Sequence, residues 1–354
     1  MKLPLALAAT ALCAAPAYAQ DDKQTAVTPN DIVNSAPQSE WSIIPDDELM
    51  VVTLAPDAKG NPREFVVQLL AEPVSASWTR NIRTMARAHW WDGLSIYRSV
   101  DNWVVQWGDG EEEESDRKSP AKPLPADIVP TSEDDYDLAW QDGMASVLWG
   151  KNGRRPVGMV SDGAAAQPGS RYADPYAAAF TYVRGIPVAV ELQDHVVTDG
   201  TDPMTNTPVR MWPVHCYGSV GVARDLSPDA GTGAELYAVI GHAPRQLDRN
   251  IAVVGKVIDG IEHLSILPRG TAGFGVYATM AEHSPIISAR LASDLPEGER
   301  PRYEFLDTQG DSFARYVDIL ANRSDSFYAV PAGGTDVCNI KVPVRMVEDA
   351  EAGS

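Results

Sequence analysis

The feature that most restricts the fold is a long series of short β-like segments, separated by joints rich in glycine and proline. Residues 49–54 and 64–70 are apolar and β-branched, and the turn residues at 57–62 between them predict a hairpin. Further strands are expected at residues 94–98, 103–106, 186–192, 219–223, 236–240, 251–257 and 285–292. So many short strands with few helices predict a mostly β chain, folded as a barrel or a sandwich.

Two segments have helical rather than β periodicity. A helix is expected after Pro73, where one apolar face recurs at i, i+4, i+7 and i+11 through Trp78, Ile82, Met85 and His89. A second helix is expected at residues 311–323, and its buried face would contain Phe313, Tyr316, Val317 and Leu320.

Two further segments depart from the series of strands. Residues 110–185 open with an acidic run at 111–114 and continue through a proline-rich stretch, which predicts an insertion into a main domain at 46–295. Residues 296–354 follow as a C-terminal extension. The sequence leaves open whether the insertion folds as a subdomain and whether the extension docks on the main domain.

The N-terminus has the pattern of an export signal. A basic start at Lys2 precedes an apolar run at residues 3–15, and Ala17-Tyr18-Ala19 provides a small-x-small cleavage site. A signal peptide is therefore expected at residues 1–19, with cleavage after Ala19 and a periplasmic location. The apolar run is too short to span a bilayer comfortably. The polar residues 20–45 contain several prolines and are expected to form a mobile leader.

The charge balance and the cysteines limit the partners and cofactors. With 49 acidic and 29 basic residues, the chain has a formal net charge of −20, which argues against nucleic-acid binding. Beyond the signal, Cys216 and Cys338 form either a disulfide or a pair of buried thiols, because sequence supplies no geometry. Metal-ligand spacing is absent from the sequence, no redox or nucleotide cofactor is implied, and a monomer is expected.

Three blocks of residues, in order, carry a family resemblance. The first is WDGLSIYRSV at 91–100 followed by WVVQWGD at 103–109, which resembles the cyclophilin segment Y-x-G-x-x-F-H-R-x-x-x-x-F-x-x-Q-x-G-D. The second is GSVGVAR at 218–224 followed by GAELYAVIG at 233–241. The third runs from Leu247-Asp248 to VGKV at 254–257. The chain therefore resembles cyclophilin-type peptidyl-prolyl cis-trans isomerases over residues 46–110 and 215–292.

The resemblance implies an eight-stranded antiparallel β-barrel closed by two helices, the one at Trp78 and a second at 258–267. It also implies a groove that binds proline-containing polypeptides and isomerises the bond before proline. Arg98 stands where the family has its catalytic arginine, and Gln106 would hold the substrate backbone or orient Arg98. The remaining groove positions would be Trp103, Val104, Ala223, Glu235, Tyr237, Leu247 and Ile251.

Several positions depart from the family pattern. Tyr97 replaces a histidine, Glu235 replaces a glutamine, and Tyr237 replaces a phenylalanine. Ile251 stands where many members have a histidine, and Gln246 where some have a tryptophan. Because Arg98 and Gln106 are retained, an active isomerase with a shifted substrate preference is expected.

Two other classes of function remain open at this stage. One is a cyclophilin-fold binding module or chaperone of the cell envelope with little isomerase activity, which the altered groove and the large insertion favour. The other is a serine hydrolase with Ser219 as nucleophile. Its elbow motif would need a glycine where Tyr217 stands, so this reading is weak.

Overall fold

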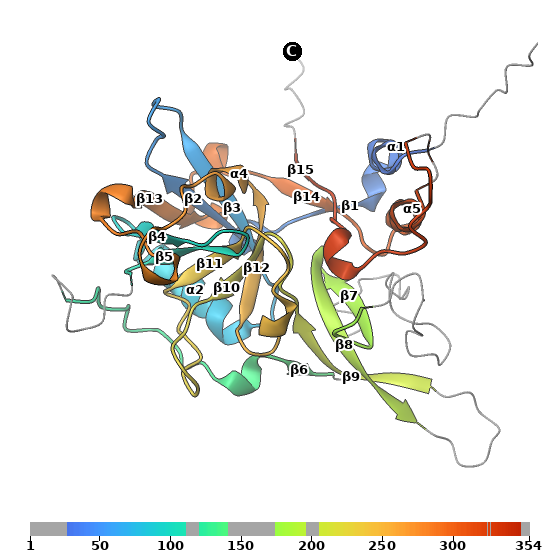
Figure 1. Ribbon diagram of the computed structural model, residues 1–354, viewed down its shortest axis with the longest axis horizontal. Helices are drawn as coiled ribbons and strands as arrows, with labels where there is room; N and C mark the ends of the chain where they lie inside the picture. The colour runs from blue at the N-terminus through green and yellow to red at the C-terminus, as the bar shows by residue number, and fades with distance from the viewer. Residues whose placement is uncertain are drawn as a thin grey trace, which may run out of the picture.

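A computed structural model describes residues 27–110, 120–140, 174–195, 205–323, 325 and 327–347. At its centre is a closed antiparallel barrel with the strand order β10-β11-β5-β4-β13-β2-β3-β12 (Figure 1). The strands are β2 (Leu49–Leu54), β3 (Arg63–Leu69), β4 (Ser95–Ser99), β5 (Val104–Gly108), β10 (Ser219–Val222), β11 (Leu236–Val239), β12 (Val253–Asp259) and β13 (Ser284–Leu291). The predicted mostly β fold and the eight-stranded barrel are confirmed.

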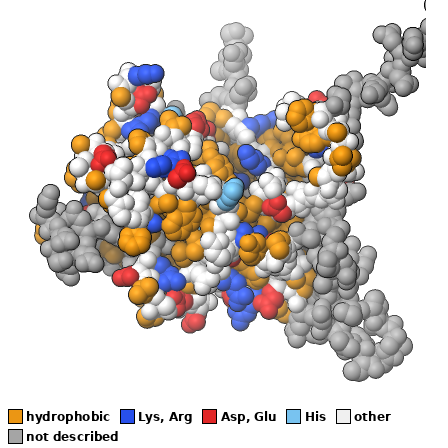
Figure 2. All heavy atoms as spheres, in the orientation of Figure 1, with side chains coloured by type: hydrophobic (Ala, Val, Ile, Leu, Met, Phe, Trp, Pro, Cys, Tyr) orange, Lys and Arg blue, Asp and Glu red, His pale blue; other side chains and the backbone are white. Residues whose placement is uncertain are grey.

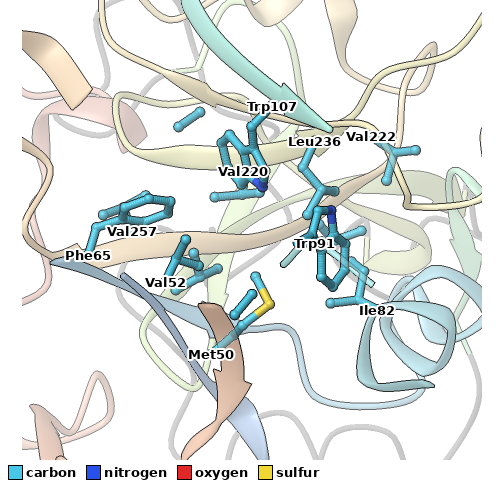
Figure 3. Packing of buried hydrophobic residues seen from close by; sticks show 14 of the residues in the cluster. Met50, Val52, Phe65, Ile82, Trp91, Trp107, Val220, Val222, Leu236 and Val257 are labelled. Atoms are coloured by element: carbon cyan, nitrogen blue, oxygen red, sulfur yellow. The ribbon is translucent and has the colours of Figure 1, made fainter. Parts of the chain in front are cut away.

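The barrel interior follows from the alternation of side chains along each strand. On β2, Met50 and Val52 point inward, and Figure 3 shows them packed with Phe65 and Trp107. Their neighbours on β2, Leu49 and Val51, belong to a different apolar cluster outside the barrel. Both faces of β2 are therefore apolar, so the strand is covered on both sides.

Two helices close the barrel, as expected. The helix α2 (Ala76–Arg87) buries one face through Trp78, Ile82 and Met85. His89, predicted on the same face, lies beyond the end of α2, where it is exposed and has a φ of 55°. The second helix is the short α4 (Glu262–Ser265), and Leu264 and Leu267 pack into the barrel core.

The chain between β5 and β10 forms a second sheet rather than a simple loop. Its strands are β6 (Leu138–Ala139), β7 (Ala179–Val183), β8 (Ile186–His195) and β9 (Thr205–Pro213), in the order β6-β9-β8-β7. The predicted strand 186–192 exists but lies in this sheet, and the barrel resumes only at Ser219, not after residue 185. Alternation identifies a strand but not the sheet it joins. The acidic run at 111–114 lies outside the described residues.

The segment expected to be a mobile leader is ordered from residue 27 onward. The helix α1 (Pro29–Ser35) begins with a capping box between Thr28 and Asp31, and β1 (Trp41–Ile43) pairs with β14 (Tyr303–Leu306). Ile32, Trp41 and Ile44 are buried. Expecting mobility was wrong here because the order comes from contacts with residues far along the chain, which local composition does not reveal. The predicted signal peptide at 1–19 lies outside the described residues.

The C-terminal extension docks on the outside of the barrel. The helix α5 (Asp311–Ala321) lies beside α1, and β15 (Val344–Met346) adds to β14 (Figure 1). Phe313, Tyr316 and Val317 are buried in α5 as expected, and Leu320 is half-buried. This extension, the N-terminal segment and the second sheet share one apolar cluster with the outer faces of β2 and β3. The outer faces of β5 and β11 carry a separate small cluster instead.

Short 3₁₀ turns complete the described elements. They are η1 (Gln38–Glu40), η2 (Asp46–Glu48), η3 (Glu133–Asp135), η4 (Arg245–Leu247), η5 (Gly273–Gly275), η6 (Met280–Glu282), η7 (Ala292–Asp294), η8 (Glu297–Glu299) and η9 (Val337–Asn339). Among the described residues, no helix combines the length and the apolar character that crossing a membrane requires.

Cys216 and Cys338 are joined by a disulfide in the structure, across 122 residues of sequence. The bond ties the turn before β10 to η9 in the extension. Cys338→Ser should lower the free energy of unfolding by about 2–5 kcal/mol, because the unfolded chain regains the freedom that a long closed loop removes. Urea unfolding with and without a reducing agent measures this loss. A wild-type midpoint unaffected by the reductant would contradict the prediction.

Candidate active site

The side chains of Arg98 and Gln106 come together because their strands pair. Arg98 on β4 lies opposite Gln106 on β5, and the register shifts between Ile96 and Arg98. The extra residue at this irregularity, Tyr97, is buried. Such an irregularity re-aims the next side chain along a strand. Arg98 is consequently half-buried on the outer face of the barrel, beside Gln106.

The guanidinium of Arg98 is fixed from three sides. Nη1 donates a hydrogen bond of 2.8 Å to Oε1 of Gln106, and Nε donates one of 2.8 Å to the backbone carbonyl of Phe274. Its central carbon lies 5.2 Å from the ring centroid of Trp103, within cation–π range. Within the described part of the chain, these bonds occupy two of the five N–H groups of the arginine. The others are available to a ligand.

An apolar floor lies beside this guanidinium. It consists of the buried residues Val104, Tyr237 and Val239, with Trp103, Ala223, Ile251 and Val100 packed against them. Val104 and Tyr237 face outward because their neighbours Val105 and Leu236 fill the barrel interior. A fixed positive group therefore stands at the edge of an apolar surface.

The hydroxyl of Tyr237 is bonded to a fully buried residue, His215. Its Oη lies 2.7 Å from Nε2 of His215, and the two rings stack with centroids 6.2 Å apart. Burial, with Asp248 nearby, raises the pKa of Tyr237 far above its usual range. The facing residue on β10 is Gly221, where a Cβ would lie 2.3 Å from Oη of Tyr237. Glycine at 221 thus makes room for tyrosine in the floor.

A comparison with protein families identifies the family of this chain. The model of the family described as cyclophilin type peptidyl-prolyl cis-trans isomerase/CLD matches residues 59–278. The chain belongs to this family. Its enzyme class is peptidyl-prolyl isomerase, and the substrates of such enzymes are proline-containing polypeptides.

A solved cyclophilin structure shares the fold. The cyclophilin AquaCyp293 from Hirschia baltica aligns with a TM-score of 0.56 and 18% identity, covering 92% of this chain and all of that one. A Cryptosporidium parvum cyclophilin-type isomerase, solved in the presence of the dipeptide Ala-Pro, aligns with a TM-score of 0.32 and 11% identity, over 68% of this chain and 98% of that one. Among curated proteins, no match was found.

Most of the residues predicted for the groove lie together in this cyclophilin. Arg98 bonds Gln106 and lies against Trp103, which packs on the apolar floor. Leu247 is half-buried in η4, where its carbonyl accepts a hydrogen bond from the backbone N–H of Ile251, and it is not part of the floor cluster. The carboxylate of Glu235 turns toward Tyr97 and Asp109 rather than toward the floor.

Two departures from the family pattern, Tyr97 and Glu235, contact each other. Nε2 of Gln106 donates to Oη of Tyr97, which donates in turn to Oε2 of Glu235 at 2.9 Å. Oε1 of Glu235 accepts from the backbone N–H of Asp109 at 2.7 Å. A Cβ at Gly108 would lie 2.0 Å from the Glu235 carboxylate, so glycine is needed beside it. This series of hydrogen bonds fixes the amide of Gln106, with its oxygen toward Arg98 and its nitrogen toward Tyr97.

Tyr97→Phe should therefore lower kcat/KM about tenfold. The change removes the hydrogen-bond partner of the buried Gln106 amide, and leaving such a group without its partner costs roughly 1–3 kcal/mol. The double variant Tyr97→His with Glu235→Gln, which carries the family's own residues, should recover activity relative to either single change. Kinetics on one Ala-Pro peptide with the wild type, Tyr97→Phe, Tyr97→His, Glu235→Gln and the double variant measures this coupling. A Tyr97→Phe enzyme with wild-type kcat/KM would show that the hydrogen bonds of Tyr97 have no role in positioning Gln106.

Sequence reasoning missed several groups around the site. The carbonyl of Phe274 holds Arg98 from a loop far along the chain, and its local sequence gives no signal of this contact. The sequence also gives no signal for His215, which joins Tyr237 to the carboxylate of Asp248, 2.9 Å from its Nδ1. The described residues contain no cluster of three or more potential metal ligands.

Proposed function

We propose that this cyclophilin accelerates rotation about X-Pro bonds by stabilising the twisted amide through Arg98. Rotation meets a barrier of about 18–20 kcal/mol because amide resonance must be lost. In the twisted state the proline nitrogen becomes pyramidal and gains a lone pair that accepts a hydrogen bond. A donor aimed at this nitrogen binds the twisted amide better than the planar one, which is the condition for catalysis.

The position of the Arg98 guanidinium at the edge of the apolar floor carries this proposal. The floor of Val104 and Tyr237 suits a proline ring, and the free N–H groups of Arg98 stand beside it. Because Phe274, Gln106 and Trp103 hold the guanidinium, little reorganisation is needed when the amide twists. The reaction needs no proton transfer, nucleophile or cofactor.

The surface is consistent with a polypeptide ligand. On the face drawn in Figure 2, acidic and basic side chains are interspersed, and apolar side chains gather near the middle. A nucleic-acid interface would instead concentrate lysine and arginine on one face.

A protease-coupled assay on an Ala-Pro peptide tests the activity. The cis fraction should convert to trans faster than the uncatalysed tens of seconds, in proportion to enzyme concentration. A folded protein with no rate above background would reject the catalytic proposal.

The proposal extends to a role in folding exported polypeptides in the periplasm. The signal pattern ending at Ala19 and the disulfide between Cys216 and Cys338, a bond typical of oxidising compartments, support it. Cell fractionation with mass spectrometry of the mature N-terminus tests this part. A chain that retains residues 1–19 and remains in the cytoplasm would reject it.

A further inference from the structure

A cavity of about 200 Å³ lies where the C-terminal extension meets the barrel. Its barrel side comes from the turn around Tyr217, from β12 and from Ile261, and its other side from residues 337–344. None of the groove residues named above lines it. The disulfide between Cys216 and Cys338 joins the two sides. The cavity is thus a separate feature of the molecule, formed only because the extension docks.

The walls of this cavity are mainly apolar. The apolar lining side chains include Val257, Ile258, Ile261, Ile340, Val342 and Val344. Such a wall stabilises an apolar group in proportion to the apolar area that it removes from water.

Two lysines bring positive charge to this apolar space. Lys256 is half-buried on β12, and its stem runs over Gly218, where a Cβ would lie 3.8 Å from its Cγ and Cε atoms. Lys341 is exposed at the other side, with Nζ 6.0 Å from the ring centroid of Tyr217.

Neither ammonium has an anionic partner among the described residues. Both lysines line the same cavity, one from the barrel and one from the extension. Burial and the charge of Lys341 lower the pKa of Lys256 to about 8, as expected for a cation that lacks a counterion.

We propose that this cavity binds a small organic carboxylate with an apolar tail, such as a medium-chain fatty acid, between Lys256 and Lys341. The carboxylate would accept charge-assisted hydrogen bonds from the ammonium groups, and the tail would occupy the apolar wall. A carboxylate satisfies both features, whereas a neutral alkyl chain leaves the lysines without a counterion. The site is independent of the isomerase groove, so this proposal does not rest on the proposed mechanism.

Isothermal titration of the full chain with octanoate and with 1-octanol tests the proposal. Octanoate should bind at least tenfold more tightly than 1-octanol, which has the same tail without the charge. Lys256→Met, which keeps the apolar stem, should weaken octanoate binding at least tenfold. The matched control Lys59→Met, at an exposed turn between β2 and β3, should bind like the wild type. Equal affinity for octanoate and octanol, or an unchanged Lys256→Met affinity, would overturn the proposal.

A second measurement uses the wild-type chain and does not depend on a variant folding. Octanoate should protect Lys256, but not Lys59, from acetylation by an N-hydroxysuccinimide ester, as read by mass spectrometry of peptides. Equal labelling of Lys256 with and without saturating octanoate would show that the cavity does not hold the carboxylate.

Discussion

Arg98→Ala should lower kcat/KM for an Ala-Pro peptide by about 10²–10³-fold, the loss typical for removing one donor from a preorganised transition-state site. The expected cause is specific. Without the guanidinium, the pyramidal proline nitrogen of the twisted amide has no charged donor, while the planar ground state loses little. The effect should therefore appear mainly in kcat, with a small change in KM, since the apolar floor that binds the ring is intact.

Two further variants sharpen this result. Arg98→Lys keeps the charge but loses the planar fork that contacts Gln106 and the Phe274 carbonyl together, so most of the activity should still be lost. Arg87→Ala, which removes an exposed arginine of α2 paired with Asp294, is the matched control and should leave kcat/KM unchanged. Thermal unfolding of each protein checks that the barrel is intact. Wild-type kcat/KM in a folded Arg98→Ala enzyme would refute the arginine mechanism.

The sequence could predict those elements whose structure depends on residues close together in the chain. The hairpin of β2 and β3 follows from turn residues between two apolar runs, and α2 follows from its period. Arg98 and Gln106 were identified because their spacing matches a family motif, and pairing of β4 with β5 places them side by side.

The parts that could not be predicted depend on contacts between distant segments. The ordered start of the chain at Trp41 pairs with residues more than 250 positions away. Glu235 was assigned to the groove from its motif position, but Tyr97, another departure from the motif, draws its carboxylate aside. A motif position predicts where the Cα atom of a residue lies, but the direction of its side chain depends on the hydrogen-bond partners within reach.

A buried ion cluster is linked to the groove floor by hydrogen bonds between residues that are distant in sequence. Arg245 in η4 is buried, and it donates to both oxygens of Asp174 at 3.2 and 2.8 Å and to Oδ2 of Asp248 at 2.6 Å. Asp248 in turn holds His215, which bonds Tyr237 in the floor. One arginine thus neutralises two carboxylates, one of which lies in the chain before β7 and the other after η4.

Arg245→Met should lower the free energy of unfolding by about 3–5 kcal/mol, because it leaves two buried carboxylates without their cation. The matched control is Arg80→Met, which removes an exposed arginine paired with Glu72 and should cost about 1 kcal/mol or less. Urea unfolding of both variants measures the difference between them.

Adding Asp174→Asn to Arg245→Met separates loss of charge balance from loss of packing. If the buried charge is the cause, the double variant should be more stable than Arg245→Met alone, since it carries one buried carboxylate fewer. If the lost packing of the arginine side chain is the cause, the second change should give no recovery. If Arg245→Met also lowers kcat/KM, its recovery in the double variant would connect the ion cluster, through His215 and Tyr237, to the groove floor.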